Sequence, residues 1–230
     1  MHETNLADPW PDLAAAVDPI LARPKAQAVV DAAKRLFLEN GYALTSMDAI
    51  TRAAGVSKAT VYEHFRSKEG LFRATLECER WRHLRAASMP DLDERPLRAW
   101  LIEAGLLVLR FALSPEVIGF CRCVVAEAGR TPELGRLFYE GGPARGRRLL
   151  AAALERARAR GEIACDDPEQ AAGHLLGLLR GDLQIRALAG LPVPTDEGAR
   201  RREVETAVDV FLRAYAPAAE APLTAPAGSR

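Results

Sequence analysis

Apolar residues recur at intervals of three and four positions along most of the chain, which is the spacing of amphipathic helices. In the first such segment Ala26, Val29, Val30, Ala33 and Phe37 form one stripe. No segment shows the alternation of β-branched and polar residues that indicates a strand. We therefore predict an all-α protein of about nine helices, at 24–40, 46–54, 57–64, 67–87, 96–113, 115–129, 132–160 with a break near Gly141-Gly142-Pro143, 168–190 and 196–215.

Three of the predicted helix starts share one local pattern. Ser114-Pro115-Glu116, Thr131-Pro132-Glu133 and Asp167-Pro168-Glu169 each combine a capping side chain, a proline at the first helical position and an acid in the first turn. Gly161, which follows the arginine-rich segment 143–160, fits a C-terminal cap.

The two ends of the chain differ from the rest in composition. Residues 1–22 hold four acidic residues, three prolines and no Lys or Arg, so we expect a flexible acidic arm. Residues 216–230 are rich in Pro and Ala, and we expect a disordered tail. The longest apolar runs are too short to span a bilayer, and the first residues lack the features of a secretory signal. We expect a soluble cytoplasmic protein that has no membrane partner.

The residues that carry chemistry in enzymes and metal sites are scattered. The four cysteines have neither disulfide nor zinc-site spacing, and the four histidines do not cluster. Serine and cysteine residues sit in no nucleophile motif. We therefore expect no catalytic site, no metal and no cofactor.

Residues 45–66 have the pattern of a helix-turn-helix. Thr45 is expected to cap the first helix, with Asp48 three residues later. Gly55 allows a tight turn, and Ser57 caps a short second helix. In that helix Val61 and Phe65 share the inward face. Such a second helix enters the major groove of DNA in helix-turn-helix proteins.

The outward face of the second helix favours DNA contact. It presents Lys58, Ala59, Thr60, Tyr62 and His64, which are small or hydrogen-bonding residues rather than alternating Glu and Lys. Lys68, at the start of the next helix, is placed to bind a phosphate. The alternative is a small three-helix bundle with an ordinary polar surface.

The distribution of charge supports the first interpretation. The chain has no net charge, but residues 23–89 hold twelve Lys and Arg against seven Asp and Glu. The positive charge therefore gathers where a surface facing phosphates would need it.

Residues 24–72 resemble the N-terminal domain of the tetracycline-repressor (TetR) family. The resemblance lies in Gly41-Tyr42, residues 45–50, residues 54–65 and residues 67–72, without gaps, while Thr51 stands where the family usually has Ala. It implies an all-helical dimer, usually a repressor, that leaves DNA when a small molecule binds its C-terminal domain. By position it implies phosphate contacts from Thr45 and Ser46, and base or phosphate contacts from Lys58, Ala59 and Thr60. It also implies contacts to the DNA backbone from Tyr62, His64 and Lys68. Ser57 completes the expected set of DNA-binding residues.

Residues 120–190 resemble the AefR-like C-terminal branch of the same family. The matching residues include 124–134, Phe138-Tyr139-Glu140, Arg160-Gly161-Glu162 and residues 176–179. Together with the composition of the two ends, the two resemblances give a flexible arm at 1–22, a DNA-binding domain at 23–70, a helical effector-binding and dimerisation domain at 71–215 and a disordered tail at 216–230. A small-molecule binding protein, or an activator without repressor activity, is the alternative function.

The last two predicted helices are candidates for the dimer interface. Three glycines spaced four apart lie on one face of 168–190, which suggests close approach of another helix, and 196–215 has an apolar stripe. The expected interface residues are Gly173, Gly177, Gly181, Val204, Val208, Phe211, Leu212 and Tyr215. The alternative is that the glycines pack against helices of the same subunit.

An effector pocket is expected among the helices between 67 and 190. The candidate lining residues are Trp81, Trp100, Phe111, Phe120, Glu127, Phe138, Tyr139 and His174, each of which could instead belong to the core. Aromatic lining with few charges favours an apolar or aromatic ligand. The expected partners are therefore double-stranded operator DNA, a second copy of the chain and a small-molecule effector.

Overall fold

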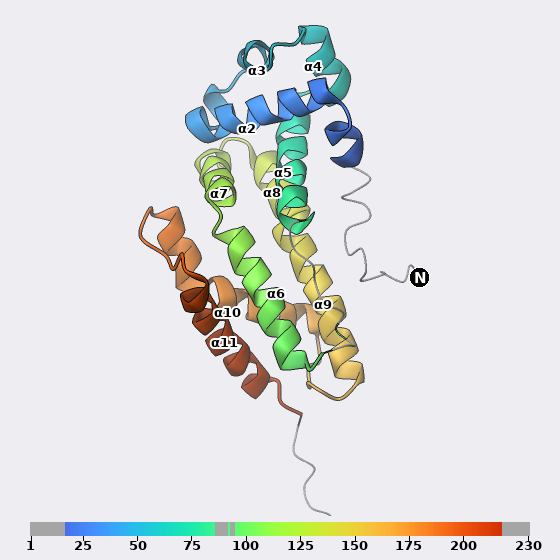
Figure 1. Cartoon of the computed structure of the whole chain (residues 1–230), viewed down its shortest axis with the longest axis vertical. Helices are drawn as coiled ribbons and strands as arrows, with labels where there is room; N and C mark the ends of the chain where they lie inside the picture. Colours follow the sequence, from blue (N-terminus) through green and yellow to red (C-terminus); the bar gives the residue numbers. More distant parts are fainter. Residues whose placement is uncertain (1–16, 86–91, 93–94, 218–230) are drawn as a thin grey trace, which may run out of the picture.

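The computed structural model describes residues 17–85, 92 and 95–217, and this part of the chain is all-α, as predicted (Figure 1). The predicted segment 132–160 forms two helices, which meet at the expected break beside Gly142. The named helices are α2 (Pro24–Leu44), α3 (Met47–Ala54), α4 (Lys58–Phe65), α5 (Lys68–Arg85), α6 (Leu97–Ala112), α7 (Pro115–Glu127), α8 (Pro132–Gly141), α9 (Pro143–Ala159), α10 (Pro168–Leu188) and α11 (Glu197–Ala214).

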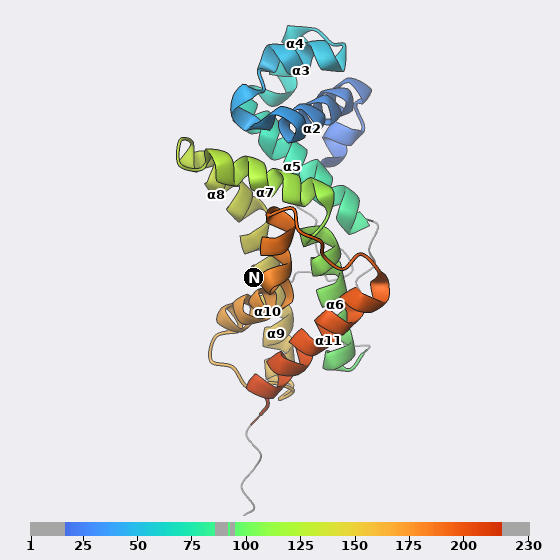
Figure 2. The ribbon, with the colours of Figure 1, turned by 90° about the vertical axis from the view of Figure 1, so that its left-hand side faces the viewer.

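The molecule is elongated, with α3 and α4 at one end (Figure 1). Helix α5 runs from that end towards the body formed by α6, α9, α10 and α11. Helices α10 and α11 lie against each other along one outer side of the body (Figure 2). The expected domain division at residues 70 and 71 falls within α5, so both parts share this helix.

Two apolar cores hold these helices together. The first contains Phe37, Ile50 and Phe72 from the N-terminal helices, and it also contains Phe120 of α7 and Leu134 of α8. The second joins α6, α9, α10 and α11. Because the first core includes α7 and α8, the N-terminal helices are packed on the body rather than linked to it by a loop.

Two of the three predicted proline-containing helix starts are capped as expected. The Ser114 hydroxyl accepts a hydrogen bond from the Val117 amide, and the Asp167 carboxylate accepts from Glu169 and Gln170. Thr131 makes no capping hydrogen bond, because its hydroxyl donates to the Glu127 carboxylate instead. Gly161 has a φ of 73°, which confirms the predicted left-handed end of α9.

The end of the expected N-terminal arm is folded. Residues 17–21 are helical, and Val17 is fully buried in the first core. Residues 1–16 of the expected arm and 218–230 of the expected tail lie outside the described residues.

We find no single helix among the described residues that is long and apolar enough to cross a membrane. Helices α6 and α7 reach that length and composition only when taken together, and they are bent by 60°.

Candidate nucleic-acid interface and ligand cavity

The turn between α3 and α4 is built by local sequence. Gly55 adopts the left-handed conformation at a φ of 66° and ends α3. The Ser57 hydroxyl then accepts the Thr60 amide at 3.1 Å and starts α4. Val61 and Phe65 are buried, as predicted, so the opposite face of α4 points away from the protein. A helix held in this way by a short turn is the geometry that reads the major groove.

Lys58 on this outward face is held by an ion pair. Its ammonium lies 2.9 Å from the Asp48 carboxylate of α3, and both side chains are exposed. The hydrogen bond from Lys58 lowers the pKa of the Asp48 carboxyl, and the same contact raises the pKa of Lys58. The Lys58 ammonium also lies 5.9 Å from the centre of the Tyr62 ring. Asp48 therefore competes with any phosphate for this lysine.

Thr45 was predicted to cap α3 and to contact a phosphate, and the position of its side chain contradicts both roles. The residue is only 2% exposed, and its hydroxyl donates to the carbonyl oxygens of Leu36 at 3.0 Å and Gly41 at 2.8 Å. Its side chain is therefore turned into the protein, away from any phosphate. The residue that caps α3 is Ser46, whose exposed hydroxyl accepts the Ala49 amide.

Lys68 lies beside the loop that joins α2 and α3. Its ammonium donates to the Ala43 carbonyl at 3.3 Å and lies 4.2 Å from the centre of the Tyr42 ring. Burial lowers the pKa of Lys68. The buried Tyr42 hydroxyl donates to the Glu69 carboxylate, and burial together with this bond raises the pKa of Tyr42. Lys68 therefore holds the loop in place next to the expected phosphate position.

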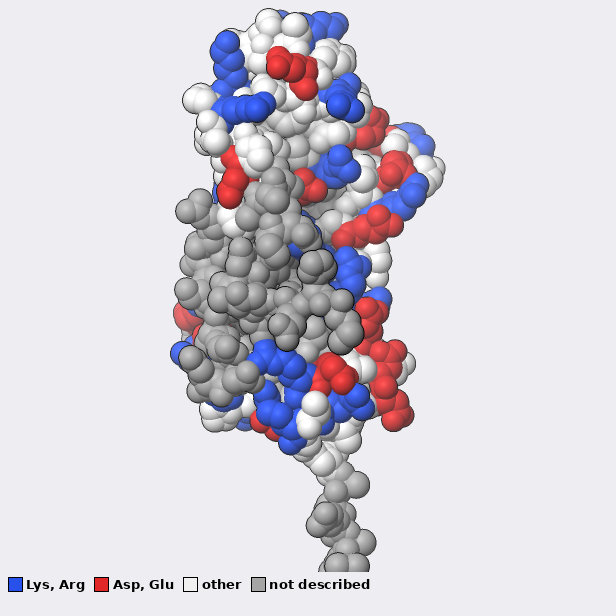
Figure 3. Space-filling model, turned by 90° about the vertical axis from the view of Figure 1, so that its right-hand side faces the viewer, with Lys and Arg blue, Asp and Glu red and all other residues white. Residues whose placement is uncertain are grey.

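The remaining expected DNA-binding residues lie at this end of the molecule. Ser46, Ser57, Ala59 and Tyr62 are exposed, and Thr60 and His64 are half-buried. Figure 3 shows Lys and Arg side chains spread over this end, with an acidic group among them. Arg52 of α3 and Arg66 after α4 are also exposed at this end, and they were not among the predicted DNA-binding residues. Their proximity in sequence to the turn is the signal that could have identified them.

A cavity of about 380 Å³ lies among α5, α6, α7, α8, α9 and α10. This volume is in the range of pockets that hold small organic ligands. Its walls carry both apolar and charged side chains: Arg73, Leu76, Glu77, Glu79, Arg80, Val108, Phe111, Ala112, Val117, Phe120, Cys121, Leu137, Phe138, Glu140, Gly141, Gly142, Pro143, Gly146, Leu176, Arg180 and Gln184.

Three of the eight expected lining residues, Phe111, Phe120 and Phe138, line this cavity, and the other five do not. Trp81 packs against the first core and Trp100 belongs to the second. Tyr139 is 51% exposed. Glu127 is buried beside Thr131, and the exposed His174 contacts the Tyr215 hydroxyl at 2.6 Å.

The charged part of the cavity was not expected. Arg80 is only 8% exposed, and burial together with repulsion from Arg145 lowers its pKa to about 10. Burial also raises the pKa of Glu77 and lowers that of Arg180. Four cavity-lining residues of α5 are spaced three or four positions apart, so they lie on one face of the helix: Arg73, Leu76, Glu77 and Arg80. This spacing is the signal that could have identified them.

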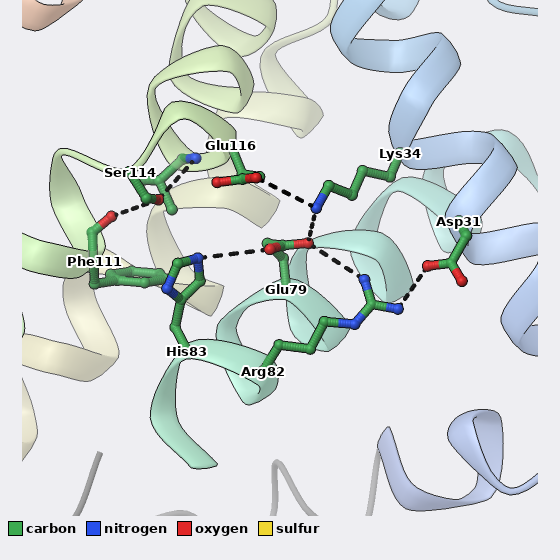
Figure 4. A network of polar contacts seen from close by, with 9 residues as sticks. Asp31, Lys34, Glu79, Arg82, His83, Phe111, Ser114 and Glu116 are labelled. Atoms are coloured by element: carbon green, nitrogen blue, oxygen red, sulfur yellow. Dashed lines mark hydrogen bonds and ion pairs between the residues drawn. The ribbon is translucent and has the colours of Figure 1, made fainter. Parts of the chain in front are cut away.

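A polar network beside the cavity connects α2, α5 and α7 (Figure 4). The Glu79 carboxylate of α5 lies 2.7 Å from the Lys34 ammonium of α2 and 3.6 Å from His83. Lys34 also lies 3.8 Å from Glu116 of α7. Glu79, His83 and Glu116 could together hold a metal ion, a grouping that the sequence did not indicate. In this structure the Lys34 ammonium pairs with both carboxylates.

Part of the expected dimer interface is buried inside the chain. Val204, Val208 and Phe211 have no exposed surface and belong to the second core, so they are not available to a partner. Leu212 and Tyr215 are half-buried against the same core. The apolar stripe of α11 faces its own chain because α11 has to cover α6.

The three glycines of α10 have different surroundings. A Cβ on Gly173 would meet Arg147 of the same chain at 3.8 Å, whereas one on Gly177 or Gly181 would meet nothing within 4 Å. Gly181 has a φ of 27° inside the helix. Gly177 and Gly181 are exposed.

Two family descriptions match the chain. Residues 29–75 match the bacterial regulatory proteins of the tetR family, and residues 99–217 match the C-terminal domain of AefR-like transcriptional repressors. Among curated proteins, the chain is 40% identical over 55 residues to the HTH-type transcriptional regulator UidR of Escherichia coli, covering 24% of this chain and 28% of UidR. It is 43% identical over 58 residues to the repressor ComR of the same species, covering 24% of this chain and 28% of ComR. The chain thus matches little more than a quarter of the length of these curated relatives.

Solved structures match over most of their length. The flavonoid-responsive regulator FrrA has a TM-score of 0.74 and 41% identity, covering 85% of this chain and 98% of FrrA. A putative TetR-family regulator from Mesorhizobium loti has a TM-score of 0.70 and 28% identity, covering 85% of this chain and 98% of that protein.

Proposed function

The chain belongs to the TetR family of bacterial regulatory proteins, and on that premise we propose that it is a transcriptional repressor that binds operator DNA as a dimer and is released by a small molecule. The observation that carries the proposal is the geometry of α5. This helix begins at Lys68, beside the loop that joins α2 and α3 at the DNA-binding end, and its next turns form a wall of the cavity. One rigid element therefore touches both sites, so a ligand that moves α5 also moves the DNA-binding end.

The DNA contacts follow from the exposed face of α4. Lys58, Ala59 and Thr60 at its first turn reach base edges or adjacent phosphates. Ser46, Ser57, Tyr62, His64 and Lys68 contact the DNA backbone around it. Thr45 holds the loop from inside and has no DNA contact.

A dimer places two copies of α4 on one operator. A single recognition helix reads few base pairs, whereas two, about 34–36 Å apart, read a palindrome across successive major grooves. The interface lies on the outer side formed by α10 and α11. On these helices the apolar side chains of Leu178, Ile185 and Val210 are exposed, as are Gly177 and Gly181 of α10. The protein acts in the cytoplasm, where its DNA lies.

The effector is an aromatic molecule of the flavonoid type. This proposal is supported by the 41% identity to a flavonoid-responsive regulator over 98% of that protein. It is also supported by the three phenylalanines in the cavity wall, because flat aromatic rings pack well on aromatic side chains.

The function is tested with the purified full-length protein and the DNA upstream of its own gene. Fluorescence anisotropy should show binding that weakens steeply with salt and is lost when 7-hydroxyflavone is added. Binding that does not depend on salt, or that is equal on unrelated DNA, would contradict the repressor function. Specific binding that survives the flavonoid would contradict the effector class alone.

A further inference from the structure

Arg80 is a buried cation without a direct partner among the described residues. It lines the cavity, and its Nε is buried and makes no hydrogen bond within the described part of the protein. A buried guanidinium has lost its hydration, so it is costly unless an acceptor replaces the lost water. Arginines at such positions in helical proteins are usually paired.

The groups around Arg80 do not compensate its charge. Glu77, one turn earlier on α5, attracts it, but no ion pair joins the two among the interactions described. Arg145 of α9 repels it. Glu79, the next acidic group on α5, also lines the cavity, but its carboxylate is paired with Lys34 and Arg82. Glu140 lines the same cavity too, but no ion pair joins it to Arg80 among the interactions described. The Arg80 guanidinium is therefore left with room for an anionic partner.

Arg80 is also placed where a ligand could meet it. Its Nη1 lies 3.9 Å from the point at which a Cβ on Gly141 would stand, so it reaches the junction of α8 and α9. Phe111, Phe120 and Phe138 line the same cavity. One cavity thus offers aromatic walls for a ring system and a cation for one acidic group.

We propose that Arg80 binds an acidic oxygen of the effector, a phenolate or a carboxylate, on an otherwise aromatic molecule. This inference rests on the proposed function only in placing the effector in this cavity. An arginine donates two parallel hydrogen bonds to a carboxylate and can donate from more than one nitrogen to a phenolate.

The test measures ligand binding by calorimetry, without DNA. The probes are 7-hydroxyflavone, flavone-carboxylic acid and unsubstituted flavone. For the wild-type protein, the two acidic ligands should bind about tenfold or more tightly than flavone. In Arg80→Met this preference should vanish while flavone binding stays. A preference for the phenol alone identifies a phenolate site, and one for the acid alone identifies a carboxylate site.

A second measurement separates a binding role from a structural one. Arg80→Met removes a buried charge and keeps a long apolar side chain, so the ligand-free variant should unfold at a higher temperature than wild type. Arg158→Met is the matched control, since Arg158 is exposed, is paired with Glu155 and lies outside the cavity lining. The control should keep the wild-type ligand preference.

Three results would overturn the role of Arg80. These are equal preference in Arg80→Met and wild type, no binding of either acidic ligand to wild type, or a loss of thermal stability in Arg80→Met with unchanged ligand affinity. Release from DNA is not measured here, so acidic ligands that bind through Arg80 without releasing DNA would support this site and contradict only the proposed function.

Discussion

Lys34 of α2 and Glu79 of α5 form an ion pair in which Nζ lies 2.7 Å from Oε2, with the Glu79 side chain 7% exposed (Figure 4). Lys34 belongs to the helix that supports the DNA-binding turn, and Glu79 belongs to the cavity wall. Arg82 extends the contact, because it lies 3.5 Å from Glu79 and 2.6 Å from Asp31 of α2. The pair therefore fixes how the DNA-binding helices sit on the wall of the cavity.

The first prediction concerns this pair. Glu79→Gln keeps the shape of the side chain but removes the charge that Lys34 and Arg82 share. We expect the free energy of unfolding in urea to fall by about 1–3 kcal/mol, because a buried charged contact is lost. We also expect a smaller ratio between the operator affinities measured without and with 7-hydroxyflavone, since α2 and α5 are then less firmly joined.

The control is Arg98→Gln, which breaks an exposed pair with Asp209 on the body. Exposed pairs contribute little, so neither stability nor the affinity ratio should change much. An unchanged affinity ratio in Glu79→Gln would exclude this pair from the coupling between the two sites.

The second prediction concerns Lys58. Asp48→Asn removes the carboxylate that holds this lysine and also removes a negative charge from the surface that faces DNA. We expect operator affinity to rise, and the slope of log affinity against log salt to steepen by roughly one unit if Lys58 gains a phosphate contact. Anisotropy at several salt concentrations measures both.

The double variant Asp48→Asn with Lys58→Ala is the control for this effect. It should show no steeper salt slope than Lys58→Ala alone, because the lysine that would be released is absent. A slope that steepens equally in both backgrounds would show that the gain comes from the surface charge and not from Lys58.

The third prediction concerns the turn of the helix-turn-helix. At Gly55 a Cβ would meet nothing within 4 Å, but the φ of 66° disfavours any residue that has a Cβ. Gly55→Ala should therefore lower the free energy of unfolding by about 1–2 kcal/mol through backbone conformation alone. Gly146→Ala on α9, where a Cβ also has open space inside a helix, should be neutral or stabilising. Equal urea midpoints for the two variants would contradict this account.

The sequence predicted the turn well because its signals are local. Gly55 and Ser57 determine where α3 ends and α4 begins through their own conformation and hydrogen bonds. At the start of α3, the cap was predicted at Thr45, whereas the neighbouring Ser46 caps the helix. Tertiary contacts cause this difference, because the Thr45 hydroxyl donates to the carbonyls of Leu36 and Gly41 in α2, which is kinked at Gly41.

The cavity and the dimer face were harder to predict because periodicity identifies a helix face but not its neighbour. Trp100 and Phe120 both lie on apolar faces, yet only Phe120 meets the cavity. The stripe of α11 that contains Phe211 faces the chain's own core in the same way. Arg80 was not recognised as a cavity residue because a charged residue in a helix is expected to be exposed unless its neighbours in the fold are known.

The last prediction separates the dimer face from the core. Ile185 of α10 is 65% exposed, whereas Phe211 of α11 is fully buried. Ile185→Asp should leave a folded monomer, because the new charge is solvated in the single chain but not in an apolar interface. Phe211→Asp should instead unfold the chain, since it places a charge in the core. Leu44→Asp, at a leucine that is 83% exposed at the DNA-binding end, should remain a dimer. Sedimentation velocity distinguishes these outcomes, and a dimeric Ile185→Asp would place the interface away from this part of α10.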